Sequence, residues 1–164
     1  MINLKLLPKV FRIHHWIKNF LLFIPLITAH KFYNLDLISI VFVAFISFSL
    51  CASAIYIIND ILDIKNDQAH PNKKNRPFAS GKISIKSGII LCFILLILSF
   101  IFALKLSGFF IFFLIFYFLL SATYSLFLKK IKYLDCLVLV TFYIIRIFSG
   151  GAVINISPSV WLII

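Results

Sequence analysis

Long uninterrupted runs of apolar residues dominate this chain. Five such runs are apparent, and a sixth begins close to the last residue. A run of about 20 apolar residues matches the thickness of a bilayer's hydrocarbon core. In lipid, only helices and closed barrels satisfy every backbone hydrogen bond. The runs are continuously apolar rather than alternating, which favours helices over the strands of a barrel. The sequence therefore predicts an all-α, polytopic transmembrane helix bundle.

The composition excludes an ordinary soluble domain. Charged residues make up 13% of the chain, against about 25% in soluble domains. The predicted spans are 16–29, 37–59, 89–104, 109–128 and 134–154. Residues 1–164 are expected to form one membrane domain, with five spans and the start of a sixth at Val160–Ile164. Because that last run has only begun, we expect an incomplete bundle, the N-terminal portion of a larger protein.

Basic residues are distributed unequally between the two ends of the predicted bundle. Of the 16 Lys and Arg residues, 13 lie before or at the start of span one, between spans two and three, or between spans four and five. The other side has only Lys31 and Lys105. By the positive-inside rule, the N-terminus and the long polar loop 60–86 face the cytoplasm. We expect an integral protein of the plasma (inner) membrane, in contact with lipid and without a nucleic-acid partner.

A cluster of carboxylates closes the second run. Three of the five acidic residues, Asp60, Asp63 and Asp67, fall within eight positions, directly after Asn59. On a continuous helix the three aspartates lie within about 60° of one another along about 10 Å. Carboxylates at a helix C-terminus repel one another and oppose the helix dipole, which disfavours three simply solvated aspartates. Hard oxygen ligands at this spacing favour one or two Mg²⁺ ions with a diphosphate. We therefore predict Asn59, Asp60, Asp63 and Asp67 as metal ligands, and the three aspartates as the catalytic centre.

Basic residues downstream are candidates for binding the phosphates. Lys73, Lys74 and Arg76 follow the cluster within the same loop. They either contact anionic lipid headgroups or clamp the phosphates that the metal bridges. Arg76 suits the second role best, because a guanidinium binds phosphate with two parallel hydrogen bonds.

Two further cations lie at or within predicted spans. Lys18 stands at the edge of the first span, either as an interfacial anchor beside Trp16 or as a substrate ligand. Arg146 lies near the middle of the fifth span, where an arginine is rare and usually faces a polar cavity. Asp135, 11 residues earlier, is its candidate partner only if the cavity spans that depth.

Together these residues resemble the UbiA superfamily of intramembrane prenyltransferases. The first aspartate-rich motif of that family, NDxxDxxxD, is matched by Asn59, Asp60, Asp63 and Asp67. A basic run, then Arg-Pro and Ser-Gly, also follows the family pattern. Further stretches resemble the decaprenyl-phosphate phosphoribosyltransferase branch: Trp16 to Asn19, Ala69 to Pro71, Tyr124 to Lys129, Leu134-Asp135, and Arg146 with Gly150-Gly151.

The resemblance implies a bundle of about nine helices around a cavity open to the cytoplasm, of which this chain covers the first half or slightly more. It implies a Mg²⁺-dependent transferase that moves 5-phosphoribose from phosphoribosyl pyrophosphate to a polyprenyl phosphate. The aspartates would hold the metal, Lys73, Lys74 and Arg76 would neutralise the leaving diphosphate, and Lys18, Asn59, Tyr124, Lys129 and Arg146 would bind substrate.

Two alternatives remain at this stage. The same fold could transfer a prenyl group from a polyprenyl diphosphate to an aromatic acceptor. A non-catalytic membrane fragment or a transport-related protein is the other possibility, although transport favours carboxylates near mid-bilayer rather than at the end of a span.

The asymmetry of basic residues makes the topology testable. A cysteine substituted for Asn72, in the long polar loop, should react with a membrane-impermeant thiol reagent only after the cells are opened. Labelling of intact cells from outside would reverse the predicted topology.

Overall fold

The computed structural model describes residues 6–156, and within them every regular element is helical, which confirms the predicted all-α class. The elements follow one another as α1 (Leu7–Val10), η2 (Ile13–Phe23), α2 (Ile24–Thr28), α3 (Leu35–Leu62), α4 (Ile64–Ala69), η3 (Lys73–Asn75), α5 (Ile85–Ala103), α6 (Gly108–Leu126), η4 (Leu128–Lys130) and α7 (Lys132–Val153). The label η marks helices of the 3₁₀ type. The predicted start of a sixth span at Val160–Ile164 lies outside the described residues.

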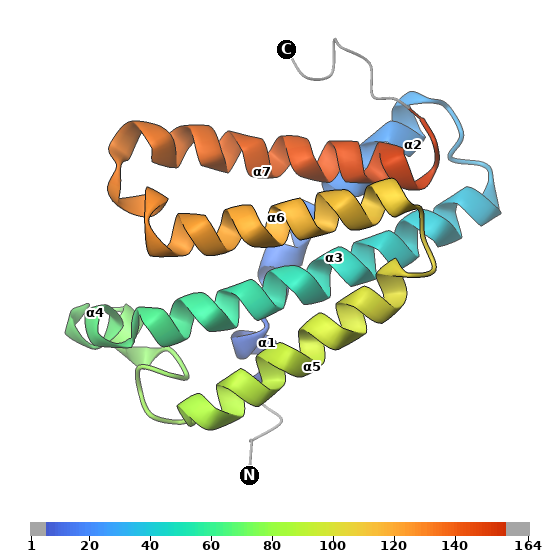
Figure 1. Cartoon of the computed structure of the whole chain (residues 1–164). Helices are drawn as coiled ribbons and strands as arrows, with labels where there is room; N and C mark the ends of the chain where they lie inside the picture. The colour runs from blue at the N-terminus through green and yellow to red at the C-terminus, as the bar shows by residue number, and fades with distance from the viewer. Residues whose placement is uncertain (1–5, 157–164) are drawn as a thin grey trace.

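Helix α3 is the centre of the bundle. It lies between α5 on one side and α6 with α7 on the other, and η2 packs against both α3 and α7 (Figure 1). Small side chains make this central position possible: Cys51, Ala52 and Ala54 are buried on α3. At the contact with α5, the Ser47 hydroxyl donates to the Ser99 carbonyl at 2.9 Å, and the Ser99 hydroxyl returns a bond to the Ser47 carbonyl at 2.7 Å. These reciprocal bonds satisfy both hydroxyls in a region without water.

Four helices are long and apolar enough to cross a membrane: α3, α5, α6 and the Leu134–Val153 part of α7. Their ends agree with the predicted spans within four residues. Local capping explains three of the starting points. Asn34, Ser84 and Ser107 each accept a hydrogen bond from the backbone N–H three residues ahead, as is typical of helix N-caps.

The first predicted span, 16–29, is not one of these four. In its place η2 runs into the short helix α2, which carries Pro25 in its first turn, where a missing N–H is tolerated. A 3₁₀-helix rises about 2.0 Å per residue and an α-helix about 1.5 Å, so the two together reach roughly 30 Å. The segment is therefore long enough to cross a hydrocarbon core, although it is not a regular α-helix.

The 3₁₀ geometry of η2 sorts its side chains into rows, because this helix has three residues per turn. Trp16, Asn19 and Leu22 form the row that faces α3 and α7, and Asn19 and Leu22 are buried. Ile17 and Phe20 form another row, which is 71% and 59% exposed. Exposed apolar side chains at these positions suit contact with lipid.

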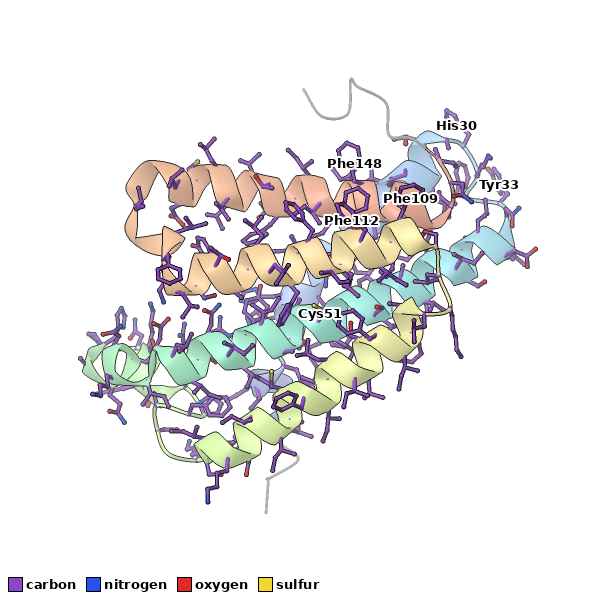
Figure 2. All side chains as sticks on the ribbon, in the orientation of Figure 1. His30, Tyr33, Cys51, Phe109, Phe112 and Phe148 are labelled. Atoms are coloured by element: carbon purple, nitrogen blue, oxygen red, sulfur yellow. The ribbon has the colours of Figure 1, made fainter. Side chains whose placement is uncertain are left out.

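The two ends of the bundle differ in character. Helix α4 and the turn between α6 and α7 lie at the same end (Figure 1). Phe109, Phe112 and Phe148 lie far from α4, towards the end that also carries His30 and Tyr33 (Figure 2). The polar loop and its aspartates are thus grouped at one end of the molecule, as the unequal distribution of basic residues predicts.

Close packing between η2 and α7 makes Gly150 sensitive to substitution. A Cβ atom at Gly150 would lie 2.0 Å from the carbonyl oxygen of Leu22, and a backbone atom cannot move aside as a flexible side chain can. We expect Gly150→Ala to lower the free energy of unfolding by about 1–3 kcal/mol or more, because this is the typical cost of overpacking. The change is measured as a fall in melting temperature in detergent.

Gly108→Ala is the matched control, because nothing lies within 4 Å of a Cβ at Gly108, the first residue of α6. Its melting temperature should stay the same or rise slightly. Equal melting temperatures for the two variants would contradict the close approach of η2 to α7.

Candidate functional site

The predicted carboxylate face is divided between two helices. Helix α3 ends at Leu62, α4 begins at Ile64, and Asp63 stands between them with φ −93° and ψ 7°. Backbone hydrogen bonds from Asp63 N to Asn59 O (2.9 Å) and from Asp67 N to Asp63 O (2.8 Å) continue the helical repeat across this break. The aspartates therefore remain near one another, but they do not share one straight helical face as the sequence predicted.

Two of the aspartates are buried and share one guanidinium. Asp60 and Asp67 are each 3% exposed. Nη1 of Arg76 donates to Asp67 Oδ2 at 2.7 Å and to Asp60 Oδ1 at 3.3 Å. Burial of a carboxylate is costly unless it is paired and hydrogen-bonded. Arg76 therefore holds the loop 70–84 against the end of α3.

Arg12 is the second partner of Asp60, and the sequence did not predict its role. Nη2 of Arg12 donates to Asp60 Oδ1, and its guanidinium lies 5.0 Å from the centre of the Tyr56 ring. The backbone of Arg12 is left-handed, with φ 49° and ψ 49°. This conformation is uncommon for a long side chain, and it persists where the surroundings impose it.

Residues on both sides of Arg12 hydrogen-bond the N-terminal segment to α3. The Trp16 indole donates to Ser53 Oγ at 3.0 Å, and the Ser53 hydroxyl donates to the Phe11 carbonyl at 2.9 Å. Val10 is fully buried and packs with Ala54 and other residues of α3. Only this docking places Arg12 at Asp60, so the charge pattern of the sequence could not have identified the pair.

Asp63 has a partner of its own. Lys129 in η4 donates from Nζ to Asp63 Oδ1 at 2.7 Å and to Oδ2 at 2.9 Å. The Asp63 side chain is 28% exposed, so it is more accessible to solvent than Asp60 or Asp67. This contact joins the α6–α7 turn to the end of α3. The structure thus brings together Asp63 and Lys129, two predicted site residues 66 positions apart.

The cluster carries balanced charge. Three carboxylates face three cations, Arg12, Arg76 and Lys129. Within residues 6–156, no three Asp, Glu, His or Cys side chains converge closely enough to surround a single metal ion. The donor set nevertheless suits Mg²⁺, because three carboxylates and the Asn59 amide offer only hard oxygen atoms. A metal bound here would compete with Arg12, Arg76 and Lys129 for the negative charge of these carboxylates.

A polar cavity of about 580 Å³ borders this cluster. It lies between the N-terminal segment and the polar loop, and its lining includes Lys9, Arg12, Asp60, Asn72, Asn75 and Arg76. Three cations and two amides give it the character of an anion-binding site. Lys73 and Lys74, predicted to contact phosphate, are exposed on η3 and are not part of this lining.

His15 borders both this cavity and a second one. Its ring packs against Tyr56 at 5.2 Å between centroids, so the two rings form part of the partition between the cavities.

The second cavity, about 220 Å³, lies inside the bundle between η2, α3, α6 and α7. Its polar lining residues are His15, Lys18, Tyr56, Asn59, Tyr117, Ser121, Tyr124, Tyr143 and Arg146. Asn59 therefore opens to this inner cavity, whereas Asp60 opens to the outer one. Ser121 is buried, and its hydroxyl has no hydrogen-bond partner of normal geometry among the described residues.

Arg146 is 4% exposed, at the edge of the inner cavity. Its Nε donates to Asn19 Oδ1 at 2.9 Å, Nη1 to the Phe142 carbonyl at 2.6 Å, and Nη2 to Tyr117 Oη at 3.2 Å. Asn19 in turn donates to Ser49 Oγ at 2.8 Å. Neutral oxygen atoms satisfy this guanidinium, and within residues 6–156 it forms no ion pair with a carboxylate.

The predicted pair between Arg146 and Asp135 is therefore wrong. Asp135 instead accepts a hydrogen bond of 2.6 Å from the Tyr124 hydroxyl. Asp135 is in the first turn of α7 and Arg146 is three turns further along, so one carboxylate could not reach both partners. The Tyr124–Asp135 bond joins α6 to α7 close to Lys129 and stiffens the turn that carries this lysine.

Comparison with known proteins identifies the family. A model of the UbiA prenyltransferase family matches residues 20–164. This match covers most of the sequence, so the chain belongs to the UbiA prenyltransferase family, and the resemblance inferred from the motifs is confirmed.

Individual relatives differ in their names. Nodulation protein NoeC of Azorhizobium caulinodans is 36% identical over 145 residues, covering 88% of this chain and 47% of that protein. A decaprenyl-phosphate phosphoribosyltransferase of Mycolicibacterium smegmatis is 31% identical over 162 residues, covering 96% of this chain and 51% of that protein. This chain thus spans about half the length of these two relatives.

A solved structure from work on digeranylgeranylglyceryl phosphate synthase in membranes has the same fold. Its TM-score is 0.81, with 23% identity, over 99% of this chain and 56% of that one. At this level of identity the likeness establishes the architecture, a helical membrane bundle of the UbiA type, and no more.

Proposed function

We propose that the protein is a Mg²⁺-dependent membrane transferase that moves 5-phosphoribose from phosphoribosyl pyrophosphate to a polyprenyl phosphate. One observation carries this proposal: three carboxylates, each held by an Arg or Lys, lie at one end of a membrane bundle, where Asp60 lines one cation-lined cavity and Asn59 lines another. The family supports a transferase. The phosphoribosyltransferase named among the relatives favours this donor and acceptor.

The aspartates would form the metal site. Asp60, Asp63 and Asp67, with the Asn59 amide, are the residues that would hold Mg²⁺. When bound, the ion would neutralise charge on the donor's diphosphate and so make it a better leaving group. Arg76 and Lys129, which hold these carboxylates here, would contact the diphosphate oxygens. Lys73 and Lys74, exposed nearby on η3, would add long-range positive charge.

The inner cavity suits a second phosphate group. Arg146 is buried and forms no ion pair with a carboxylate among residues 6–156, which is costly in a membrane, and an anion beside it would relieve that cost. Lys18, Tyr124 and Ser121, whose hydroxyl has no hydrogen-bond partner in the described part of the chain, line the same cavity. These groups would bind either the 5-phosphate and ribose hydroxyls of the donor or the phosphate of the acceptor.

The transfer itself needs little proton chemistry. The bond between ribose C1 and the diphosphate oxygen breaks, and the electron pair leaves with the diphosphate. An oxygen of the anionic polyprenyl phosphate supplies the electron pair for the new bond to C1. The residues of this chain would act by holding two polyanions close together and by excluding water, which are positioning and electrostatic effects.

Asp63 offers the cleanest test of the metal site. Asp60 and Asp67 are buried in ion pairs, so their replacement would also disturb the fold, whereas Asp63 is partly exposed. In the full-length gene product, Asp63→Asn should abolish turnover, since losing several kcal/mol of metal assistance means more than about a hundredfold in rate. Melting temperature measured without Mg²⁺ should change little, because a partly exposed ion pair contributes about 0–1 kcal/mol.

Asp36→Asn is the matched control, because Asp36 is exposed in the first turn of α3, at the other end of that helix. It should leave turnover unchanged. Wild-type turnover in the Asp63→Asn protein would rule out Asp63 as a metal ligand.

Choice of donor is tested separately, by limited proteolysis of the polar loop. Lys73 and Lys74 are exposed sites for trypsin. With Mg²⁺, phosphoribosyl pyrophosphate should protect this loop better than geranyl diphosphate does, because the ribose and the 5-phosphate can engage Lys18, Lys129 or Arg146. Each added charged hydrogen bond contributes about 1.5–3 kcal/mol, or roughly tenfold to a hundredfold in affinity.

Protection is measured as the ligand concentration that halves the cleavage rate, with Mg²⁺ alone and with EDTA as controls. Equal or stronger protection by geranyl diphosphate would favour prenyl transfer to an aromatic acceptor instead.

A further inference from the structure

The ion pairs at the carboxylate cluster imply an order to the binding of metal and phosphate. Asp60, Asp63 and Asp67 are already neutralised by Arg12, Arg76 and Lys129. A divalent cation entering alone would add positive charge beside Arg12, Arg76 and Lys129, which already neutralise these carboxylates. A polyanion entering alone would have to draw those cations away from buried carboxylates. Binding of the cation alone or of the polyanion alone is therefore unfavourable. When both bind together, the carboxylates pair with the metal and the Arg and Lys side chains pair with the polyanion.

We propose that Arg12 is the exchanging residue. Its ion pair with Asp60 keeps divalent cations from this carboxylate. When a phosphorylated ligand and a divalent cation arrive, the guanidinium transfers to a phosphate oxygen and Asp60 binds the cation. Metal and ligand therefore bind cooperatively, and Arg12 carries much of the coupling between them. This inference rests on the proposed function, because it assumes that the cluster binds a metal and a phosphate.

Three features distinguish Arg12 from the other cations of the cluster. Asp60 keeps a second partner, Arg76, when Arg12 leaves. The Arg12 side chain borders the outer cavity of about 580 Å³, so a phosphate could meet its guanidinium there. Its left-handed backbone is held by neighbours on both sides, Phe11 and Trp16, which are hydrogen-bonded to Ser53. The backbone is thus fixed while the side chain can change partner.

Arg76 need not change partner, because Nη1 alone joins Asp60 to Asp67 and holds the polar loop in place, and its other N–H groups could contact a diphosphate. Lys129 belongs to a different carboxylate, Asp63. The outer cavity also contains Lys9, Asn72 and Asn75, which lie outside the four long apolar helices. The ligand chemistry that this lining fits is a phosphate or diphosphate group.

The test measures cation binding directly and requires no turnover. Binding of Mn²⁺ to the purified full-length gene product in nanodiscs is followed by electron paramagnetic resonance. Titrations are run without anion, with inorganic pyrophosphate in solution, and with farnesyl phosphate in the bilayer. The last two arms distinguish a soluble source of the phosphate from a lipid one, and titrations without protein correct for Mn²⁺ bound by the anions themselves.

Arg12→Asn is the principal variant, because asparagine tolerates a left-handed backbone and removes the charge without adding strain. Lys9→Gln is the matched control: it removes one positive charge from the same cavity, and Lys9 forms no ion pair with a carboxylate in the described part of the chain. Arg12→Lys keeps the charge, and it should retain part of the coupling if Arg12→Asn folds poorly. Melting temperatures verify the fold of each variant.

In the wild-type protein we expect pyrophosphate or farnesyl phosphate to raise Mn²⁺ affinity by at least about tenfold, within the usual range of coupling between sites. In Arg12→Asn, Mn²⁺ alone should bind more tightly than to wild type, and the anion should raise its affinity by no more than about threefold. Lys9→Gln should need more anion to reach saturation, because Lys9 lines the anion-binding cavity, but at saturating anion the ratio of its two Mn²⁺ affinities should equal that of wild type.

The outcomes distinguish a failure of the proposed function from a failure of the role of Arg12. If wild type binds no Mn²⁺ in any arm, the metal-dependent function itself fails. If wild type shows the coupling and Arg12→Asn shows the same ratio, the function stands and the role of Arg12 is overturned. The role of Arg12 would also be overturned if the ratio of Mn²⁺ affinities with and without anion fell more in Lys9→Gln than in Arg12→Asn. General positive charge in the cavity would then be enough to explain the coupling.

Discussion

The pairing of two buried carboxylates with cations from distant segments holds the functional end of this bundle together. Asp60 and Asp67 are nearly inaccessible to solvent, and a buried carboxylate without a partner costs several kcal/mol. Their partners are separated from them by 48 residues for Arg12 and by 16 and 9 for Arg76. The N-terminal segment, the end of α3 and the polar loop therefore become ordered together. The outer cavity lies between these three segments, whose positions depend on the charge pairs.

The sequence predicted the part of this architecture that depends on local composition. Apolar runs gave the four long helices within four residues, and the spacing of Asp60, Asp63 and Asp67 located the cluster. What local composition could not predict is which cation meets which carboxylate. The partner of Asp60 depends on how the N-terminal segment docks on α3, and the break at Asp63 depends on the loop that follows. The expected Arg146–Asp135 pair was wrong because Tyr124 satisfies this carboxylate from the neighbouring helix.

Two cavities of different kinds meet at the end of α3. Asp60 opens to the outer cavity beside the polar loop, and Asn59 opens to the inner cavity between the helices. Adjacent residues on a helix point about 100° apart, so one turn of α3 serves both cavities. A water-soluble polyanion and a phosphate on a lipid would approach such a site from different directions. The Asn59-Asp60 step places one side-chain oxygen at each cavity.

The 3₁₀ form of η2 lets one short segment make several of the contacts around this site. With three residues per turn, side chains three positions apart lie in line. In one row, Trp16 is hydrogen-bonded to Ser53, and Asn19 is hydrogen-bonded to both Ser49 and Arg146. The adjacent row places His15 and Lys18 at the inner cavity. In an α-helix, positions three apart diverge by about 60° per step, so neither row would stay aligned over this length. The stretched helix thus allows one short segment to contact α3, line the cavity and support the buried Arg146.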